Sequence, residues 1–150
     1  MVAHSLGLVL GSEIPPERLR PMVVEELYRA FRAGDKDGML AVLHPDVEVS
    51  FLGQVYLRGT AAAGRFFDFA GGLLHDVDFT LEAVLVDGDV AAGIWHETAT
   101  TFSGEPWENH GVDVVHVRDG RVVALHENND VRKTYEHFPR YDPESRPADG

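Results

Sequence analysis

The chain has 150 residues, of which 44% are apolar, and this is enough for one globular domain with a sizeable core. Its 25 acidic residues outnumber its 13 basic residues, which gives a formal net charge of −12, so we expect neither nucleic acid nor an anionic membrane as a partner. The lack of cysteine excludes thiolate catalysis, disulfide bonds and thiolate zinc sites.

The beginning of the chain predicts an N-terminal arm over residues 1–20, which carry two glycines and two prolines. The only early apolar run is Leu6 to Leu10, which is too short to span a membrane and lacks the cationic start typical of a signal peptide. We therefore expect a soluble, cytoplasmic protein.

Helical patterns follow the arm. Apolar residues with helical spacing begin near Pro21, which suits a first-turn position, and Gly34 ends this helix. Asp35 or Asp37 can cap a second, short helix. Thr60 is expected to cap a third, phenylalanine-rich helix.

Strand patterns dominate the rest of the chain. A first strand is expected over Val47 to Leu52, and from Val77 onward long strands cover about residues 77–86 and 89–102. Helices followed by antiparallel strands predict an α+β domain over residues 21–138, in which a strongly curved sheet forms a cone around the N-terminal helices. Such concave interiors commonly hold small ligands. Residues 139–150 have the composition of a flexible tail.

Two acids lie inside the apolar strands of the last hairpin, which reads W-E-N-H-G-V-D-V-V-H-V-R-D-G-R-V-V-A-L-H-E-N-N-D over residues 107–130. Side chains alternate between the faces of a strand, so Asp113 and Glu127 each point to solvent or into a pocket. An acid in an apolar pocket carries a desolvation cost, which makes this hairpin the best candidate for an active site.

The loop of this hairpin decides the direction of both acids. With a two-residue turn at Asp119-Gly120, Arg118 lies opposite Arg121 and Asp113 shares a face with His126. With a three-residue loop and a left-handed Gly120, the two acids share a face as diagonal neighbours about 7 Å apart. We prefer the three-residue loop because it avoids a pair of like charges, although Asp-Gly also favours the shorter turn.

Three segments resemble the nuclear transport factor 2-like superfamily. They are R-A-G-D-K-D-G-M-L-A-V-L-H-P-D-V-E-V at 32–49, R-G-T-A at 58–61 and G-V-D-V-V-H-V-R-D-G-R-V-V at 111–123. The superfamily includes ketosteroid isomerase, SnoaL-like polyketide cyclases, limonene-epoxide hydrolase and phenazine-biosynthesis proteins. The resemblance covers about residues 22–138. It specifies the fold well and the reaction poorly, because the fold hosts many chemistries.

Carried over residue by residue, the resemblance argues against steroid isomerisation. It places Asp113 at the hydrogen-bond-donating acid of the isomerase. It also places Phe51 at the proton-shuttling aspartate and Leu27 at the oxyanion-hole tyrosine. Two of the isomerase's three functional groups are thus replaced by apolar side chains.

Other branches of the superfamily match the last strand better. Glu127 falls where SnoaL-like cyclases and the epoxide hydrolase have a catalytic aspartate, and where the phenazine-pathway proteins have a glutamate. The stretch Glu108-Asn109-His110 also resembles those phenazine proteins. The epoxide hydrolase further needs an arginine and a second aspartate on the preceding strand, where this chain offers His96 and Thr98.

The resemblance supports the three-residue loop and turns one face of each strand into the cone. It directs Asp113, Leu125, Glu127 and Asn129 inward, together with Ile94, His96 and Thr98. Further parts of the pocket wall are expected from Trp107, Asn109, Phe51, Phe66 and Phe67.

Such a pocket suits acid/base chemistry. An acid with apolar walls and a second acid nearby should have a raised pKa, so it can exchange protons near neutrality. We assign Glu127 as general base or acid, Asp113 as a protonated hydrogen-bond donor and His96 as a second acid/base or orienting group. Asn109 and Asn129 are expected to hold a carbonyl or enolate oxygen. Proton transfer at an enolisable carbon needs no cofactor, and we expect none.

The eight histidines do not predict a metal site, because their spacing matches no helical ligand motif. In the preferred register His110, His116 and His126 face outward together.

The outward face of the hairpin is expected to carry Val112, Val114, Val122 and Ala124, which is too apolar for a fully solvated surface. A homodimer formed through this outer sheet face would cover it.

Three functions remain open. The favoured one is a cofactor-independent cyclase, isomerase or dehydratase that acts on a small apolar carbonyl or polyketide-like compound. The second is a noncatalytic module that binds a small ligand or a protein. The third is an epoxide hydrolase-like enzyme.

Overall fold

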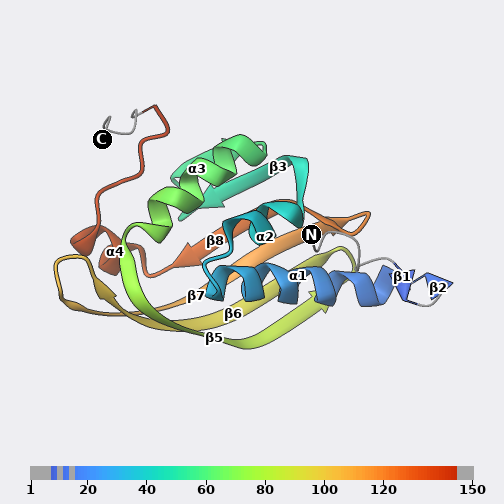
Figure 1. Cartoon of the computed structure of the whole chain (residues 1–150), viewed down its shortest axis with the longest axis horizontal. Helices are drawn as coiled ribbons and strands as arrows, with labels where there is room; N and C mark the ends of the chain where they lie inside the picture. The colour runs from blue at the N-terminus through green and yellow to red at the C-terminus, as the bar shows by residue number, and fades with distance from the viewer. Residues whose placement is uncertain (1–7, 10–11, 14–15, 145–150) are drawn as a thin grey trace.

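The computed structural model describes residues 8–9, 12–13 and 16–144, and it confirms the predicted α+β fold (Figure 1). The helices are α1 (Pro16–Arg32), α2 (Lys36–Ala41), α3 (Thr60–Gly71) and α4 (Val131–His137). The strands are β1 (Leu8–Val9), β2 (Ser12–Glu13), β3 (Leu43–Phe51), β4 (Val55–Arg58), β5 (Leu74–Asp87), β6 (Val90–Thr101), β7 (Pro106–Arg118) and β8 (Arg121–Asn129). No helix within these described ranges is long and apolar enough to cross a membrane.

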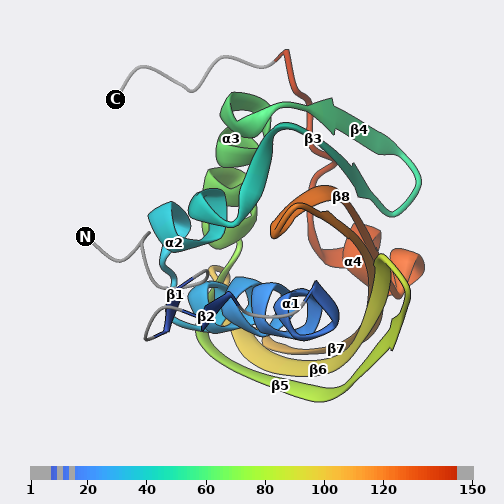
Figure 2. The same ribbon diagram turned by 90° about the vertical axis from the view of Figure 1, so that its right-hand side faces the viewer.

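A curved, unclosed sheet forms one side of the molecule. In the described part of the chain it has six strands in the order β4-β3-β8-β7-β6-β5, antiparallel throughout except for the parallel pair β3 and β8. Figure 2 shows β5, β6 and β7 curving around α1, while α3 lies beside β3 and β4. The concave face of the sheet therefore holds the helices, as the cone prediction requires.

Helix α1 packs its apolar face into this hollow. Val23 and Val24 are fully buried, and the Tyr28 ring stacks on Phe79 of β5 at a centroid distance of 5.7 Å. The helix begins at Pro16 rather than near Pro21, so it includes residues that we had assigned to the arm. Pro16 and Pro21 both suit the first turn of a helix, so the sequence alone did not show at which of them α1 begins.

The caps of the next two helices only partly follow the sequence. The Asp35 side chain accepts a hydrogen bond of 2.8 Å from the backbone nitrogen of Gly38, so Asp35 caps α2. Thr60, in contrast, is the first residue of α3, and Gly59 occupies the cap position with a φ of 85°. Glycine adopts this left-handed conformation without steric cost.

The β7–β8 hairpin places both acids inward, but not through the loop that we expected. Asp119 and Gly120 have φ angles of 51° and 71° and form a two-residue turn, so Arg118 pairs with Arg121. The predicted three-residue loop is wrong. The like-charge pair is tolerated because both arginines are exposed at the end of the sheet.

A bulge restores the shared face. Between the pairs Val117–Val122 and His116–Ala124 the register shifts by one residue, which leaves Val123 without a partner across the strands. As a result Asp113 lies directly opposite Glu127. The same bulge turns Val122 into the core, where it is fully buried, so the prediction that it faces outward is wrong.

Within the predicted flexible tail, Tyr141 packs against the folded domain. The Tyr141 ring lies 5.3 Å from the Phe66 ring and 5.0 Å from the Phe69 ring, so this residue packs against α3. The remainder of the predicted tail, residues 145–150, lies outside the described residues, as does most of the predicted arm.

Candidate active site

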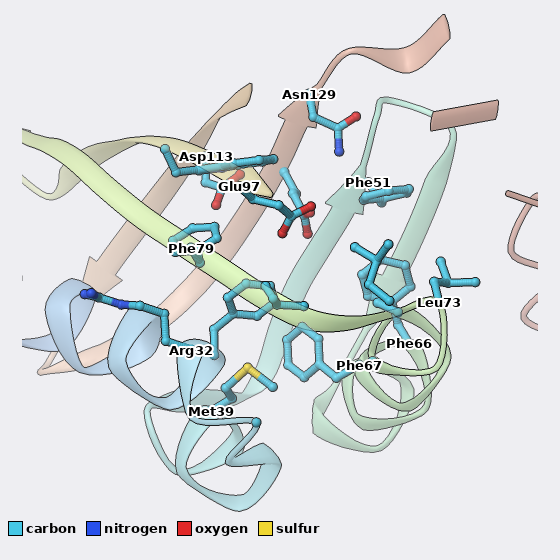
Figure 3. Close-up of a pocket in the computed structure, with 18 of the residues that line it drawn as sticks. Arg32, Met39, Phe51, Phe66, Phe67, Leu73, Phe79, Glu97, Asp113 and Asn129 are labelled. Atoms are coloured by element: carbon cyan, nitrogen blue, oxygen red, sulfur yellow. The ribbon is translucent and has the colours of Figure 1, made fainter. Parts of the chain in front are cut away.

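A cavity of about 600 Å³ opens between the inner face of β6, β7 and β8 and the helices α1 and α3. Its wall is rich in aromatic residues, and Figure 3 shows Phe51, Phe66, Phe67 and Phe79 among them. The aromatic residues are Tyr28, Phe31, Phe51, Phe66, Phe67, Phe79, Trp95, Trp107 and Phe138. Three acids of adjacent strands, Glu97 of β6, Asp113 of β7 and Glu127 of β8, line the same space.

Asp113 occupies the middle strand and is 7% exposed. The Tyr28 hydroxyl of α1 donates a hydrogen bond of 2.7 Å to its Oδ2 atom. Burial raises the pKa of Asp113 to about 6, and the hydrogen bond from Tyr28 partly opposes this rise. Burial next to Asp113 also raises the pKa of Tyr28, so the phenol stays protonated and remains a donor.

Two glycines make room for this arrangement. A Cβ atom at Gly93, directly opposite Asp113, would lie 2.3 Å from the Tyr28 hydroxyl oxygen. A Cβ atom at Gly111 would lie 2.1 Å from the Trp95 ring. Both glycines therefore permit an aromatic side chain to lie flat on the sheet. The Oδ1 atom of Asp113 and the Trp95 indole nitrogen are buried without a hydrogen-bond partner among the described residues.

Glu127 has a different environment although it faces Asp113 across the strands. It is half-buried, because it borders the cavity, and no described residue donates a hydrogen bond to its carboxylate. Burial raises the pKa of Glu127 well above its ordinary value, and repulsion by Asp113 and Glu97 raises it further. Of the directly paired acids, Asp113 has a donor that favours its ionised form, whereas Glu127 has none.

Glu97 is the third acid and is 7% exposed. Its Oε1 atom accepts a hydrogen bond of 2.8 Å from the indole nitrogen of Trp107. Burial raises the pKa of Glu97, while the bond from Trp107 opposes the rise. Figure 3 shows Glu97 and Asp113 directed toward the same part of the cavity.

Six of the predicted wall residues line the cavity. They are Phe51, Phe66, Phe67, Trp107, Leu125 and Asn129. The Asn129 oxygen accepts a hydrogen bond of 2.9 Å from the Thr134 hydroxyl, which leaves its amide nitrogen for a ligand. In Figure 3 this nitrogen is directed toward the cavity.

Asn109 does not line the cavity, contrary to its predicted role. It is 1% exposed, and its oxygen accepts hydrogen bonds from the backbone nitrogens of His110 and Asp130, at 2.9 and 3.4 Å. Its amide nitrogen donates to the Thr134 hydroxyl at 3.4 Å. Asn109 therefore joins β7 to the start of α4.

The predicted orientation of β6 is wrong. Ile94, His96 and Thr98 do not face the cavity, since Trp95 and Glu97 occupy its wall. His96 lies on the outer face, paired across the strands with His110 and hydrogen-bonded to Glu108 at 2.9 Å. Ile94 lines a shallow outer groove. Successive residues of a strand point to opposite faces, so an error of one residue in the alignment exchanged the inward and the outward residues of β6.

Sequence reasoning missed three site residues: Tyr28, Trp95 and Glu97. The resemblance placed Leu27 where the isomerase has its tyrosine, yet the adjacent Tyr28 is the residue that reaches Asp113. Isolated glycines inside strands often indicate a close approach by another group, and Gly93 was the available signal for Tyr28.

The chemistry available to this site is proton exchange in an apolar space. A protonated Glu127 can donate to an oxygen of a bound compound, and its carboxylate can accept a proton from carbon. Among the described residues, the donor atoms close enough to share a metal ion are those of His96, Glu108 and His110, which lie on the outer face rather than in the cavity.

Comparison with known proteins identifies both a family and a fold. The sequence profile described as "SnoaL-like domain" matches residues 24–125. A search of curated proteins finds no match.

Three solved structures illustrate the likeness in fold. An NTF2-like protein of unknown function from Burkholderia pseudomallei is 20% identical, with a TM-score of 0.73 over 79% of this chain and 96% of that one. A putative SnoaL-like polyketide cyclase from Jannaschia is 18% identical, with a TM-score of 0.72 over 85% and 96%. An LEH-like epoxide hydrolase from M. tuberculosis is 19% identical, with a TM-score of 0.68 over 81% and 91%. At these identities the likeness establishes the fold and leaves the reaction open.

Proposed function

The chain belongs to the SnoaL-like domain family, and from this premise we propose that it is a cofactor-independent acid/base enzyme. Its substrate is a small, largely apolar carbonyl or polyketide-like compound. The observation that carries the proposal is the pair of acids Asp113 and Glu127, directly opposed on the inner face of the sheet and enclosed by aromatic side chains. Structural sites seldom place two acids together away from water, because both lose hydration.

The pair holds its proton on Glu127. Asp113 accepts a hydrogen bond from Tyr28, which favours its carboxylate form, while Glu127 has no such donor among the described residues. The negative charge of Asp113 in turn raises the pKa of Glu127. Asp113 thus acts through Glu127 as a positioning residue rather than as the protonated donor that we expected from the sequence, and Glu127 is the group that exchanges protons with the substrate.

The proposed reaction step relocates one proton. Glu127 donates its proton to the carbonyl oxygen, which the Asn129 amide nitrogen orients, and an O–H bond forms. The resulting Glu127 carboxylate accepts the proton from the adjacent carbon, so the C–H bond breaks and its electron pair forms the enol. Glu127 returns to its protonated state. Cyclisation, isomerisation and dehydration can each proceed from the enol without a cofactor.

A second candidate, epoxide hydrolysis, is favoured by Glu97. The epoxide hydrolases that the chain resembles need an additional acid on the strand before the hairpin, and Glu97 supplies an inward acid there. The hydrogen-bond donor to Glu97 is Trp107 rather than an arginine, and the arginine that lines the cavity, Arg32, comes from α1. A third candidate is a noncatalytic module that uses the same aromatic cavity to bind a small ligand.

We further propose that two copies associate through the outer sheet face. Leu85 and Val112 on this face are 60% and 41% exposed, and Ile94 lies between the strands that carry them. An apolar sheet face of this kind is commonly covered by a partner.

The test is a substrate screen of the wild-type protein and Glu127→Gln. Enolisable ketones are incubated in D2O and deuterium incorporation is followed by NMR, while epoxides are scored for diol formation. Because glutamine cannot transfer a proton, we expect Glu127→Gln to lose about 100-fold or more in deuterium exchange. Glu105→Gln, at an exposed acid in the β6–β7 turn, is the control and should exchange at the wild-type rate.

Each candidate gives a different result. Diol formation that requires Glu127 would favour the epoxide hydrolase. Ligand-induced thermal shifts of equal size in both proteins, with turnover in neither, would favour the binding module. Equal deuterium exchange by wild type and Glu127→Gln would remove Glu127 from the mechanism.

A further inference from the structure

A second cluster of chemically active side chains lies on the opposite side of the sheet from the cavity. His96 of β6 and His110 of β7 are direct cross-strand partners, with ring centroids 4.7 Å apart. Glu108 lies two positions before His110 on the same strand, so its side chain shares their face. One donor atom from each of the three residues lies within 4.8 Å of the others.

We propose that His96, Glu108 and His110 form a binding site for zinc or a related divalent first-row transition-metal ion. Two imidazole nitrogens and one carboxylate oxygen are ligands that zinc and related first-row ions accept. Three protein ligands leave further coordination positions open. The site is independent of the acid/base function, because it lies on the other face of the strands.

The geometry is close to what coordination requires. Zinc lies about 2.0–2.2 Å from nitrogen and oxygen ligands, so ligands in a tetrahedron are about 3.2–3.6 Å apart. His96 Nε2 and Glu108 Oε1 are 2.9 Å apart, and the most distant pair of donors need approach only from 4.8 Å or less. Small rotations of the side chains suffice. The backbone need not move, since the continuous pairing of β6 with β7 fixes its spacing.

The charges around the cluster are mixed. The chain as a whole is strongly acidic, with a formal net charge of −12, which favours a bound cation. Glu108 adds a carboxylate to the cluster and is hydrogen-bonded to His96 at 2.9 Å. Lys133 disfavours a cation, but its amine lies over the Trp107 ring, 5.8 Å from the ring centroid.

A second histidine pair on the same face provides an internal control. The rings of His116 and His126 are 5.8 Å apart, and His126 Nδ1 forms a 2.7 Å hydrogen bond with the Ser50 hydroxyl. Among the described residues, no acid joins these two histidines within the distance that defines the first cluster. The two pairs therefore differ in the carboxylate ligand.

The spacing of residues in the sequence does not reveal this metal site. The earlier expectation of no metal rested on helical spacings, whereas here one histidine comes from β6 and two ligands come from β7. Their convergence depends on the register that pairs residue 96 with residue 110. That register cannot be derived from the spacing of histidines alone.

The experiment is isothermal titration of zinc chloride into the full, metal-free protein in a buffer that does not chelate zinc. We expect one zinc ion per chain. Substitutions His96→Asn, Glu108→Gln and His110→Asn should each weaken binding by about tenfold or more, in line with the sensitivity of metal sites to lost ligand interactions. The double substitution of His116 and His126 to asparagine should leave the affinity unchanged.

Two further measurements keep the proposal falsifiable. Zinc should raise the Tm of the wild type and of the His116/His126 double variant but not that of His96→Asn, because binding stabilises only a fold that contains the site. Glu127→Gln should bind zinc as the wild type does, which separates the site from the acids of the cavity. Absence of binding, an affinity that all variants share, or loss of binding in Glu127→Gln would overturn the proposal.

Discussion

The two faces of the strands β6, β7 and β8 differ in chemistry and in burial. The inner face carries Glu97, Asp113 and Glu127 in an aromatic cavity, where burial raises the pKa of all three acids. The outer face of the same strands carries histidines and aliphatic side chains that are half-buried or exposed. Because side chains alternate between the two faces of a strand, a sequence with the acids on the outer face and the apolar residues on the inner face would fold to a state of lower free energy. The comparison indicates that the inner face retains acids at a cost in stability, which is expected of a functional site.

The largest effect on stability should come from adding a side chain at Gly111, which leaves room for Trp95 on the inner face. A Cβ atom at Gly111 would lie 2.1 Å from the Trp95 ring and 2.5 Å from the backbone oxygen of Asn128. Since the backbone cannot yield easily, we expect Gly111→Ala to lower the free energy of unfolding by about 3 kcal/mol, measured by urea denaturation.

The matched control for this substitution is Gly71→Ala. Gly71 ends α3, and a Cβ atom there would meet nothing within 4 Å. Replacement of glycine at such a position should leave stability unchanged or raise it by up to about 1 kcal/mol. Equal losses at Gly71 and Gly111 would show that the inner face has no special steric requirement.

The next effect concerns pH. The pKa of Asp113 is about 6 in the folded protein, above its ordinary value of 3.8, so the folded state binds this proton more tightly than the unfolded state. Its contribution to stability is therefore complete below pH 4 and is lost as the pH rises through 6. Ionisation of Asp113 should account for about 3 kcal/mol of the fall in unfolding free energy from pH 4 to pH 8, and Glu97 and Glu127 add to this fall because their pKa values are also raised.

Asp113→Asn should make this fall smaller and leave the variant more stable than the wild type at pH 8. Asp119→Asn, in the exposed turn of the same hairpin, should retain the wild-type profile. If Asp113→Asn follows the wild-type curve, Asp113 ionises without the burial cost that the inner face implies.

The inward direction of the two acids could be predicted from the sequence, but the bulge that aligns them could not. Asp113 and Glu127 stand in apolar runs, and both lie in the cavity wall. Their alignment depends on the bulge at Val123, and a single extra residue in an apolar strand leaves no distinctive pattern.

The orientation of β6 could not be predicted from its pattern. One face carries Ile94 and His96, and the other carries Trp95 and Glu97, so each set combines an apolar with a polar residue. Periodicity then gives no preference between the faces. The contact of Tyr28 with Asp113 joins residues 85 positions apart, and it depends on how a helix docks onto the sheet. Local patterns carry no information on that docking.

A smaller effect is expected from the partner of Asp113. Tyr28→Phe removes the hydrogen bond to Oδ2, which favours the ionised carboxylate. We expect the pKa of Asp113 to rise by about one unit, the equivalent of one charge-assisted hydrogen bond, as measured by NMR titration of the carboxyl carbon. Tyr56→Phe is the control, since Tyr56 is 74% exposed and bonds only to the Gly53 carbonyl among the described residues. A lower pKa for Asp113 in Tyr28→Phe would contradict the assigned role of Tyr28.

The smallest effect is expected on the outer face, at His116. This residue is half-buried, lies opposite Val90 and Ala124, and makes a ring contact with His126. Its replacement by asparagine should change the free energy of unfolding by no more than about 0.5 kcal/mol, because His116 is not one of the buried core residues in the described part of the chain.

Its neighbour Val115 makes the comparison between faces direct. Val115 is one position away, points inward and is fully buried, so Val115→Ala should cost about 2 kcal/mol in urea denaturation through lost packing. A similar loss in His116→Asn at low protein concentration would place His116 in the folding core and remove the distinction between the faces. A loss that grows with protein concentration would instead show that a second copy covers the outer face, since the stability of an associated protein depends on its concentration.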